Sequence, residues 1–172
     1  MTWIVMSVVV MLSTVVQTML PAYAFMGQAR APMLLAIVLY YSLKRDTTTM
    51  LIAALMAGFV HDALSEIPMG YSSLCFGAVG FAAGHFRELI TKESLLPHSL
   101  IGAAAGFAST VVLYAILKGG GHVGCRLNWC ILKAFWTGVL GLWSVPLVCA
   151  LTAWLDGLVG NIAVRRNVTG IE

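Results

Sequence analysis

Residues 3–20 of the chain read WIVMSVVVMLSTVVQTML, an apolar run without a single charged side chain. Its length is close to the ~20 residues that an α-helix needs to cross the hydrocarbon core of a bilayer. Pro21 then ends the helical pattern, because proline cannot continue a helix without losing a hydrogen bond. Ala22 and Ala24 form a small-x-small pattern, but no Lys or Arg precedes the run. We therefore expect a retained helix rather than a cleaved signal peptide.

The composition of the whole chain agrees with a membrane location. Of its 172 residues, 60% are hydrophobic and only 10% are charged, whereas soluble domains contain about 45–50% apolar and about 25% charged residues. A soluble fold of this size could not bury so much apolar side chain, because small folds keep a large surface. Membrane lipid can surround these side chains instead. The net charge of +3 is small and scattered, which argues against a nucleic-acid partner.

Five further apolar runs follow the first, separated by proline, glycine or charged residues. They span residues 32–43, 47–64, 69–86, 97–117 and 131–155. With residues 3–20 they predict an all-α fold, an integral membrane bundle of six transmembrane helices in one multi-pass domain over residues 1–172. Pro32 is a good first residue for the second helix. That run covers only ~18 Å as a helix, so it is either a core helix shielded by its neighbours or a helix that extends back through Gln28.

The placement of Lys and Arg predicts the orientation. If all six runs cross, both termini share a side with Lys44, Arg45, Arg87, Lys92, Arg165 and Arg166, while Arg30, Lys118, Arg126 and Lys133 lie at the other. Cytoplasmic loops carry the excess of basic residues. We therefore expect both termini in the cytoplasm.

Small residues recur at helical spacing within the runs. Gly80 and Gly84 form one GxxxG pattern, and Gly102 and Gly106 form another. Such residues let helix backbones approach closely in lipid. They could form a homodimer face or pack within the bundle, and the presence of several patterns in one chain favours packing within the bundle.

His61, Asp62 and Glu66 form the most notable polar group. Asp62 and Glu66 are four residues apart and share a helix face, and ionisable residues at membrane depth are candidates for function. One interpretation is a helix end at the membrane interface. The other is that Asp62 accepts hydrogen bonds from the turn at Met69 and Gly70 and so orients the hairpin between the third and fourth runs.

The cysteine spacing and the lack of catalytic motifs argue against a catalytic or metal-binding function. Cys125 and Cys130 could form a local disulfide or, with His122, part of a metal site, but a fourth ligand is missing, and unpaired thiols are favoured. Nothing predicts a nucleotide-binding loop or a nucleophilic triad, so we expect no enzyme, cofactor, metal or catalytic residue. An intramembrane enzyme that uses Asp62 and Asp156 is disfavoured, because the two lie far apart in sequence.

One succession of residues resembles the MreD family of bacterial rod-shape-determining membrane proteins. Pro32-Met33-Leu34-Leu35-Ala36 leads to Lys44-Arg45, and Gly58-Phe59-Val60-His61-Asp62 is followed by Pro68-Met69-Gly70. The likeness covers residues 32–84, and His61 is not a feature of the family pattern. It implies a location in the bacterial inner membrane, and it marks Pro32, Gly58, Asp62 and Gly70 as a partner-binding or structural motif.

The resemblance also implies a function in assembly. MreD-like proteins pair with MreC, a single-pass protein, and are implicated in linking MreB filaments to RodA and a class B penicillin-binding protein. A second hypothesis is a small-molecule-binding membrane subunit like that of energy-coupling-factor vitamin transporters, a family thought to share the MreD fold. Such a subunit needs convergent polar groups around a pocket, and the outward loops offer few.

Overall fold

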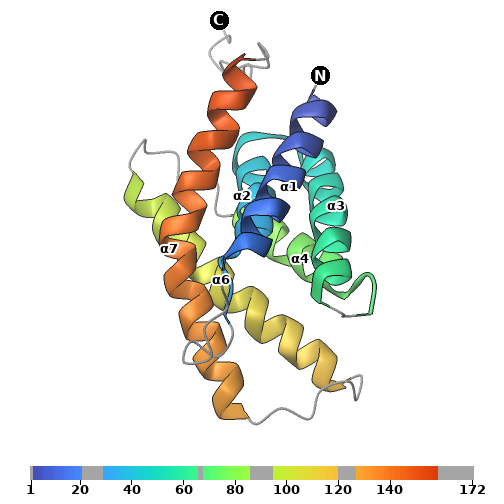
Figure 1. The fold of residues 1–172 in the computed structure, drawn as a ribbon, viewed down its shortest axis with the longest axis vertical. Helices are drawn as coiled ribbons and strands as arrows, with labels where there is room; N and C mark the ends of the chain where they lie inside the picture. Colours follow the sequence, from blue (N-terminus) through green and yellow to red (C-terminus); the bar gives the residue numbers. More distant parts are fainter. Residues whose placement is uncertain (1, 21–28, 66–67, 86–94, 120–126, 159–172) are drawn as a thin grey trace, which may run out of the picture.

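The computed structural model describes residues 2–20, 29–65, 68–85, 95–119 and 127–158. Within these residues the chain forms six helices and no strand, which confirms the predicted all-α fold (Figure 1). The helices are α1 (Thr2–Met19), α2 (Met33–Lys44), α3 (Thr47–Ser65), α4 (Tyr71–His85), α6 (Leu95–Gly119) and α7 (Leu127–Leu158). Figure 1 shows that α1 begins and α7 ends at the same end of the bundle.

Two helix boundaries differ from the prediction in an informative way. Pro32 precedes the first residue of α2 as its N-cap, and its carbonyl accepts a hydrogen bond from the Ala36 N–H at 3.0 Å. α7 begins at Leu127 and ends at Leu158, and is therefore longer than residues 131–155. It continues through Pro146, because transmembrane helices tolerate an internal proline where neighbouring groups satisfy the freed backbone.

Helix length separates five of the described helices into two groups, and α4, with 15 residues, is in neither. Residues 47–65, 99–119 and 128–157 form helices that are long and apolar enough to cross a bilayer, judged by length and composition. α1 and α2 are shorter apolar helices. The outward surface is apolar as well: Ile4, Met11 and Leu147 are exposed, and the side chain of Trp143 is 81% exposed. So many exposed large apolar side chains indicate a surface that contacts lipid or a partner.

α2 is the centre of the bundle. Every residue from Leu34 to Ser42 is buried, and α2 contacts all five of the other described helices, α1, α3, α4, α6 and α7. A helix that is hydrophobic on all sides is stable only where it is surrounded. Residues 29–32 are not helical, so α2 does not extend back along the chain. The structure thus favours the interpretation of this short helix as a core helix shielded by its neighbours.

α6 and α7 form a hairpin whose interface is built from glycines. A β-carbon at Gly102 would lie 2.7 Å from the carbonyl oxygen of Gly141, and one at Gly106 would lie 3.0 Å from that of Thr137. Gly138 in turn faces the carbonyl oxygen of Ala103. The backbones of α6 and α7 therefore touch. Gly102 and Gly106, the glycines predicted to serve helix packing, contact α7 of the same chain.

Gly84 faces α2, and Gly80 faces both α2 and α3. A β-carbon at Gly80 would lie 2.9 Å from both Val38 and Met50, and one at Gly84 would lie 3.1 Å from the Ser42 hydroxyl. The Ser42 hydroxyl also donates a hydrogen bond to the Gly80 carbonyl. This part of α4 therefore packs closely against the central helix.

Candidate functional site

Three of the four residues of the sequence motif, Gly58, Asp62 and Gly70, meet where α3 packs against the start of α4. We call this region the α3–α4 corner; it consists of Gly58, His61, Asp62, Gly70, Ser72 and Ser73. α3 ends at Ser65, and Pro68 cannot join a helix that precedes it. Gly70 has φ +102, a backbone conformation that glycine adopts without a steric cost. The chain can therefore reverse there and start α4 at Tyr71.

Asp62 holds the corner together. Its carboxylate is 1% exposed, and its Oδ2 accepts the backbone N–H of Gly70 at 2.7 Å. The N–H of Ser72 lies 3.2 Å from Oδ1 and 3.3 Å from Oδ2. The expected hydrogen bond from the turn at residues 69–70 is therefore present, and a second one extends it into α4.

Asp62 thereby caps a helix to which it does not belong. The first backbone N–H groups of a helix lack intrahelical acceptors, and a side chain at the N-cap position usually supplies one. Gly70 occupies that position in α4, because its carbonyl accepts the Leu74 N–H, and it has no side chain. The carboxylate of Asp62 in α3 replaces it, and its negative charge is also favoured at a helix N-terminus.

His61, Ser72 and Ser73 complete the polar contacts of the corner. His61 Nδ1 and the Ser72 hydroxyl are 2.9 Å apart, and the ring of His61 makes an edge contact with Phe76. The Ser73 hydroxyl donates to the Leu55 carbonyl at 3.3 Å. The sequence motif did not include these serines, although a pair of serines directly after the turn is a signal that could have indicated them.

Gly58 brings α3 and α4 into backbone contact. A β-carbon at this position would collide with Cα, N and Oγ of Ser73. The glycine of the motif is therefore required by the close approach of two helices. The motif positions 58, 62 and 70 meet at one corner, whereas Pro32 lies at the start of α2 and is not part of it.

A second buried polar group, which the sequence did not reveal, joins α2 to α7. We call it the α2–α7 network; it consists of Tyr40, Arg45 and Asp156. The Tyr40 hydroxyl donates to Asp156 Oδ2 at 3.0 Å, and Arg45 Nη2 lies 3.7 Å from the same oxygen. Asp156 is only 4% exposed, so these contacts compensate for the burial of its charge.

Asp62 and Asp156 are not a pair. Arg45, which contacts Asp156, lies two residues before the start of α3, whereas Asp62 lies near the end of that helix. Because a helix rises ~1.5 Å per residue, α3 from Thr47 to Asp62 spans roughly 22 Å. The two carboxylates thus serve separate polar groups, and the hypothesis of an intramembrane enzyme built on both is not supported by their positions.

The remaining candidate sites from the sequence are a disulfide and a metal site. Among the residues that the structure describes, no three His, Cys, Asp or Glu side chains gather in a way that could hold a metal ion. Cys130 is buried in the first turn of α7, but Cys125, His122 and Glu66 lie outside the described residues. A disulfide between Cys125 and Cys130 therefore stays a prediction. Cys75 is buried in α4, and its thiol donates to the Ser109 carbonyl.

Comparison with known proteins identifies the family. The family model described as rod shape-determining protein MreD matches residues 1–158, which include all six described helices. Comparison with curated proteins and with solved structures found no match, so the likeness to the energy-coupling-factor fold stays a prediction. The family match gives no support to a vitamin-transporter subunit. It covers most of the chain, and the chain therefore belongs to the MreD family of rod-shape-determining membrane proteins.

Proposed function

We propose that the chain is a non-catalytic scaffold of the cell-elongation complex in the bacterial inner membrane. In this proposal it pairs with an MreC-like single-pass protein and couples MreB filaments to peptidoglycan synthesis by RodA and a class B penicillin-binding protein. Membership in a rod-shape-determining family supports the proposal. The α3–α4 corner supports the non-catalytic role, because the carboxylate of Asp62 already accepts hydrogen bonds from the backbone N–H groups of Gly70 and Ser72.

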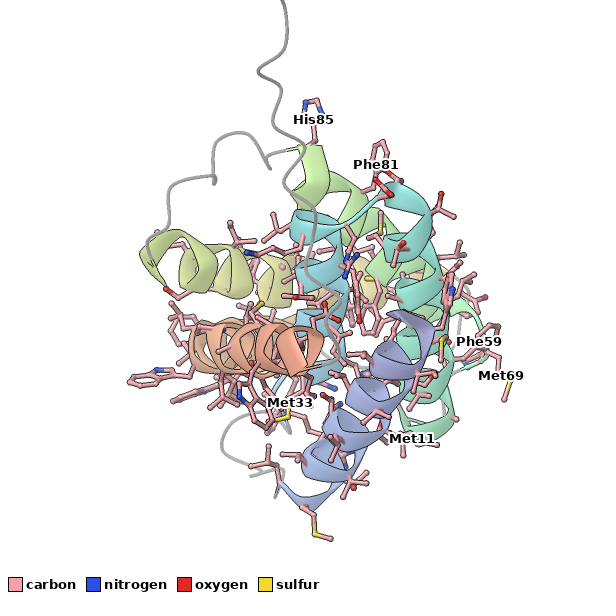
Figure 2. All side chains as sticks on the ribbon, turned by 90° about the horizontal axis from the view of Figure 1, so that it is seen from above. Met11, Met33, Phe59, Met69, Phe81 and His85 are labelled. Atoms are coloured by element: carbon pink, nitrogen blue, oxygen red, sulfur yellow. The ribbon has the colours of Figure 1, made fainter. Side chains whose placement is uncertain are left out.

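The proposal assigns the α3–α4 corner to partner binding. Gly58, Asp62 and Gly70 together set the angle and the spacing at which α3 meets α4. A rigid corner presents a neighbouring surface in one geometry, which lowers the entropic cost of binding a partner. Met69, at the tip of the corner, is exposed, and Figure 2 shows its side chain pointing away from the bundle. We therefore infer that the partner contacts the exposed surface around Met69.

The proposed topology has six crossings with both termini in the cytoplasm. Three helices meet the length and composition required for a span, and the common end at which α1 begins and α7 ends is consistent with an even number of crossings. α2 is short enough to need its neighbours as a shield. Reporter fusions after Arg45 and at Gly120 test the topology: the first should report the cytoplasm and the second the opposite side.

A pull-down from native membranes tests the scaffold function. The wild-type chain should recover a single-pass coiled-coil protein under mild detergent. Asp62→Ala removes the acceptor that holds the corner, so we expect normal membrane insertion, reduced partner recovery and rounded cells. Recovery of no such protein by the wild type would contradict the scaffold function itself.

Two control variants separate partner binding from general instability. Ser65→Ala changes a hydroxyl at the same end of α3 and should bind and support rods like the wild type. Tyr40→Phe removes a buried hydrogen bond of the α2–α7 network, at the other end of α3, and should destabilise the chain without a specific loss of the partner. If Asp62→Ala and Tyr40→Phe reduce recovery equally at equal stability, the corner is not the binding site.

A further inference from the structure

A cavity of about 300 Å³ lies at the end of the bundle opposite the α3–α4 corner. It is bounded by the end of α2, the start of α3 and the end of α4. Its polar lining comes from Ser42, Arg45, Asp46, Thr47 and His85. Gly84 also borders it and contributes no side chain that would fill it. The volume is at the lower limit of small-molecule pockets, enough for a compact polar group.

The cavity is placed where a lipid headgroup would be. α2 ends and α3 begins beside it, and the ends of membrane helices lie at the level of the headgroups. Viewed from above, Phe81 and His85 lie at the outer edge of the bundle (Figure 2). Phe81 is 65% exposed, and with Met50 it supplies the apolar part of the lining. The cavity therefore combines a polar wall with an apolar border at the lipid-facing edge.

The charges of the cavity have opposite signs and lie next to each other. Arg45 and Asp46 are consecutive residues, and both line the cavity. Asp156 contacts the guanidinium of Arg45 from the interior at 3.7 Å, which helps to orient it. A guanidinium carries five N–H donors and can serve more than one acceptor. A ligand that places a phosphate near Arg45 and a cation near Asp46 would complement both charges.

We propose that this cavity binds the headgroup of phosphatidylethanolamine. Its phosphate accepts hydrogen bonds from Arg45, the preferred residue for phosphate, and its primary ammonium donates to the carboxylate of Asp46. Ser42 and Thr47 line the same cavity, and the acyl chains leave past Phe81. Phosphatidylcholine fits less well because its quaternary nitrogen has no N–H donor. Phosphatidylglycerol fits less well because it has no cation for Asp46.

Lipid competition on the full-length chain in detergent tests this site. The protein is incubated with equal amounts of phosphatidylethanolamine, phosphatidylcholine and phosphatidylglycerol of identical acyl chains, and the retained lipids are counted by native mass spectrometry. The wild type should retain phosphatidylethanolamine roughly threefold to tenfold above the other two, as expected for one charge-assisted hydrogen bond at a partly exposed site. Equal retention of the three lipids would overturn the proposal.

Variants assign the two charges separately. Asp46→Asn keeps a side chain that can cap α3 but removes the negative charge, so the preference for phosphatidylethanolamine should disappear while retention of phosphatidylglycerol stays the same or rises. Arg45→Gln should lower retention of all three lipids. Lys44→Gln removes a neighbouring exposed charge that does not line the cavity and should leave the preference intact. An unchanged preference in Asp46→Asn would refute the assignment of the ammonium.

A soluble competitor distinguishes a lipid from a free ligand. O-phosphoethanolamine carries the same two charges without acyl chains, and it should displace the lipid only weakly because the apolar border is left empty. If it binds with full strength and the lipid does not bind, the site belongs to a soluble ligand and the lipid proposal is wrong. Partner recovery in the pull-down is a separate readout, so either proposal can fail without the other.

Discussion

The backbone of Ser73 lies against Gly58 so closely that α3 and α4 leave no room for a side chain between them. We predict that Gly58→Ala destabilises the protein by about 1–3 kcal/mol, the usual cost of overpacking a well-packed interior. The obstacle is the backbone of α4, which cannot move aside as the end of a flexible side chain could. Thermal unfolding in detergent measures the effect.

Gly77→Ala is the matched control for this prediction. Gly77 belongs to the same helix pair, but a β-carbon there would meet only the side chain of Leu51, at 4.0 Å. Alanine also favours helix over glycine by up to ~1 kcal/mol, so this variant should be as stable as the wild type or more stable. Equal losses in both variants would show that the contact at Gly58 is not special.

Gly70 is required for a different reason, which is its backbone. A β-carbon at Gly70 would meet nothing within 4 Å, but its φ is +102. We therefore predict that Gly70→Ala costs about 1–2 kcal/mol through backbone strain alone. Gly157→Ala also enters open space, without a positive φ, and should cost nothing in the same thermal unfolding assay.

The two adjacent tyrosines of α2 give opposite predictions. Tyr40 donates a hydrogen bond to Asp156, so Tyr40→Phe should lower the stability by about 1–2 kcal/mol, because it leaves a buried carboxylate with one donor fewer. The hydroxyl of Tyr41 is buried without a hydrogen-bond partner among the described residues. Tyr41→Phe should therefore be neutral or stabilising, since it removes an unsatisfied polar group. A larger loss for Tyr41→Phe than for Tyr40→Phe would contradict the α2–α7 network.

The interface of α6 and α7 makes a prediction about oligomeric state. Gly102→Ala should destabilise the hairpin by about 1–3 kcal/mol, because its β-carbon would lie 2.7 Å from the Gly141 carbonyl oxygen. Ala104→Val adds bulk to an exposed position of the same helix and should be tolerated. Since this glycine interface is filled within the chain, neither variant should change the mass in detergent measured by light scattering. A change of mass in Gly102→Ala alone would instead indicate a homodimer face.

Hydropathy alone was enough to predict an all-helical membrane bundle. A run such as residues 3–20, which has no charge, can satisfy its backbone hydrogen bonds within the segment itself only as a helix, and this holds regardless of what surrounds it. The turn at Gly70 was also predictable, because proline and glycine act through the local backbone. The acceptor for that turn was predictable because Asp62 lies only eight residues away.

Contacts between residues distant in the chain depended on the tertiary structure. Nothing in the local sequence links Tyr40 to Asp156, which are 116 residues apart, or brings the carbonyl of Gly141 against Gly102. Whether α2 is exposed or central depends likewise on the five described helices around it. Local patterns determine which segments become helices, because backbone hydrogen bonds close within a turn. Only the packing of the helices decides which polar groups meet, because in lipid that packing depends on the fit of whole surfaces.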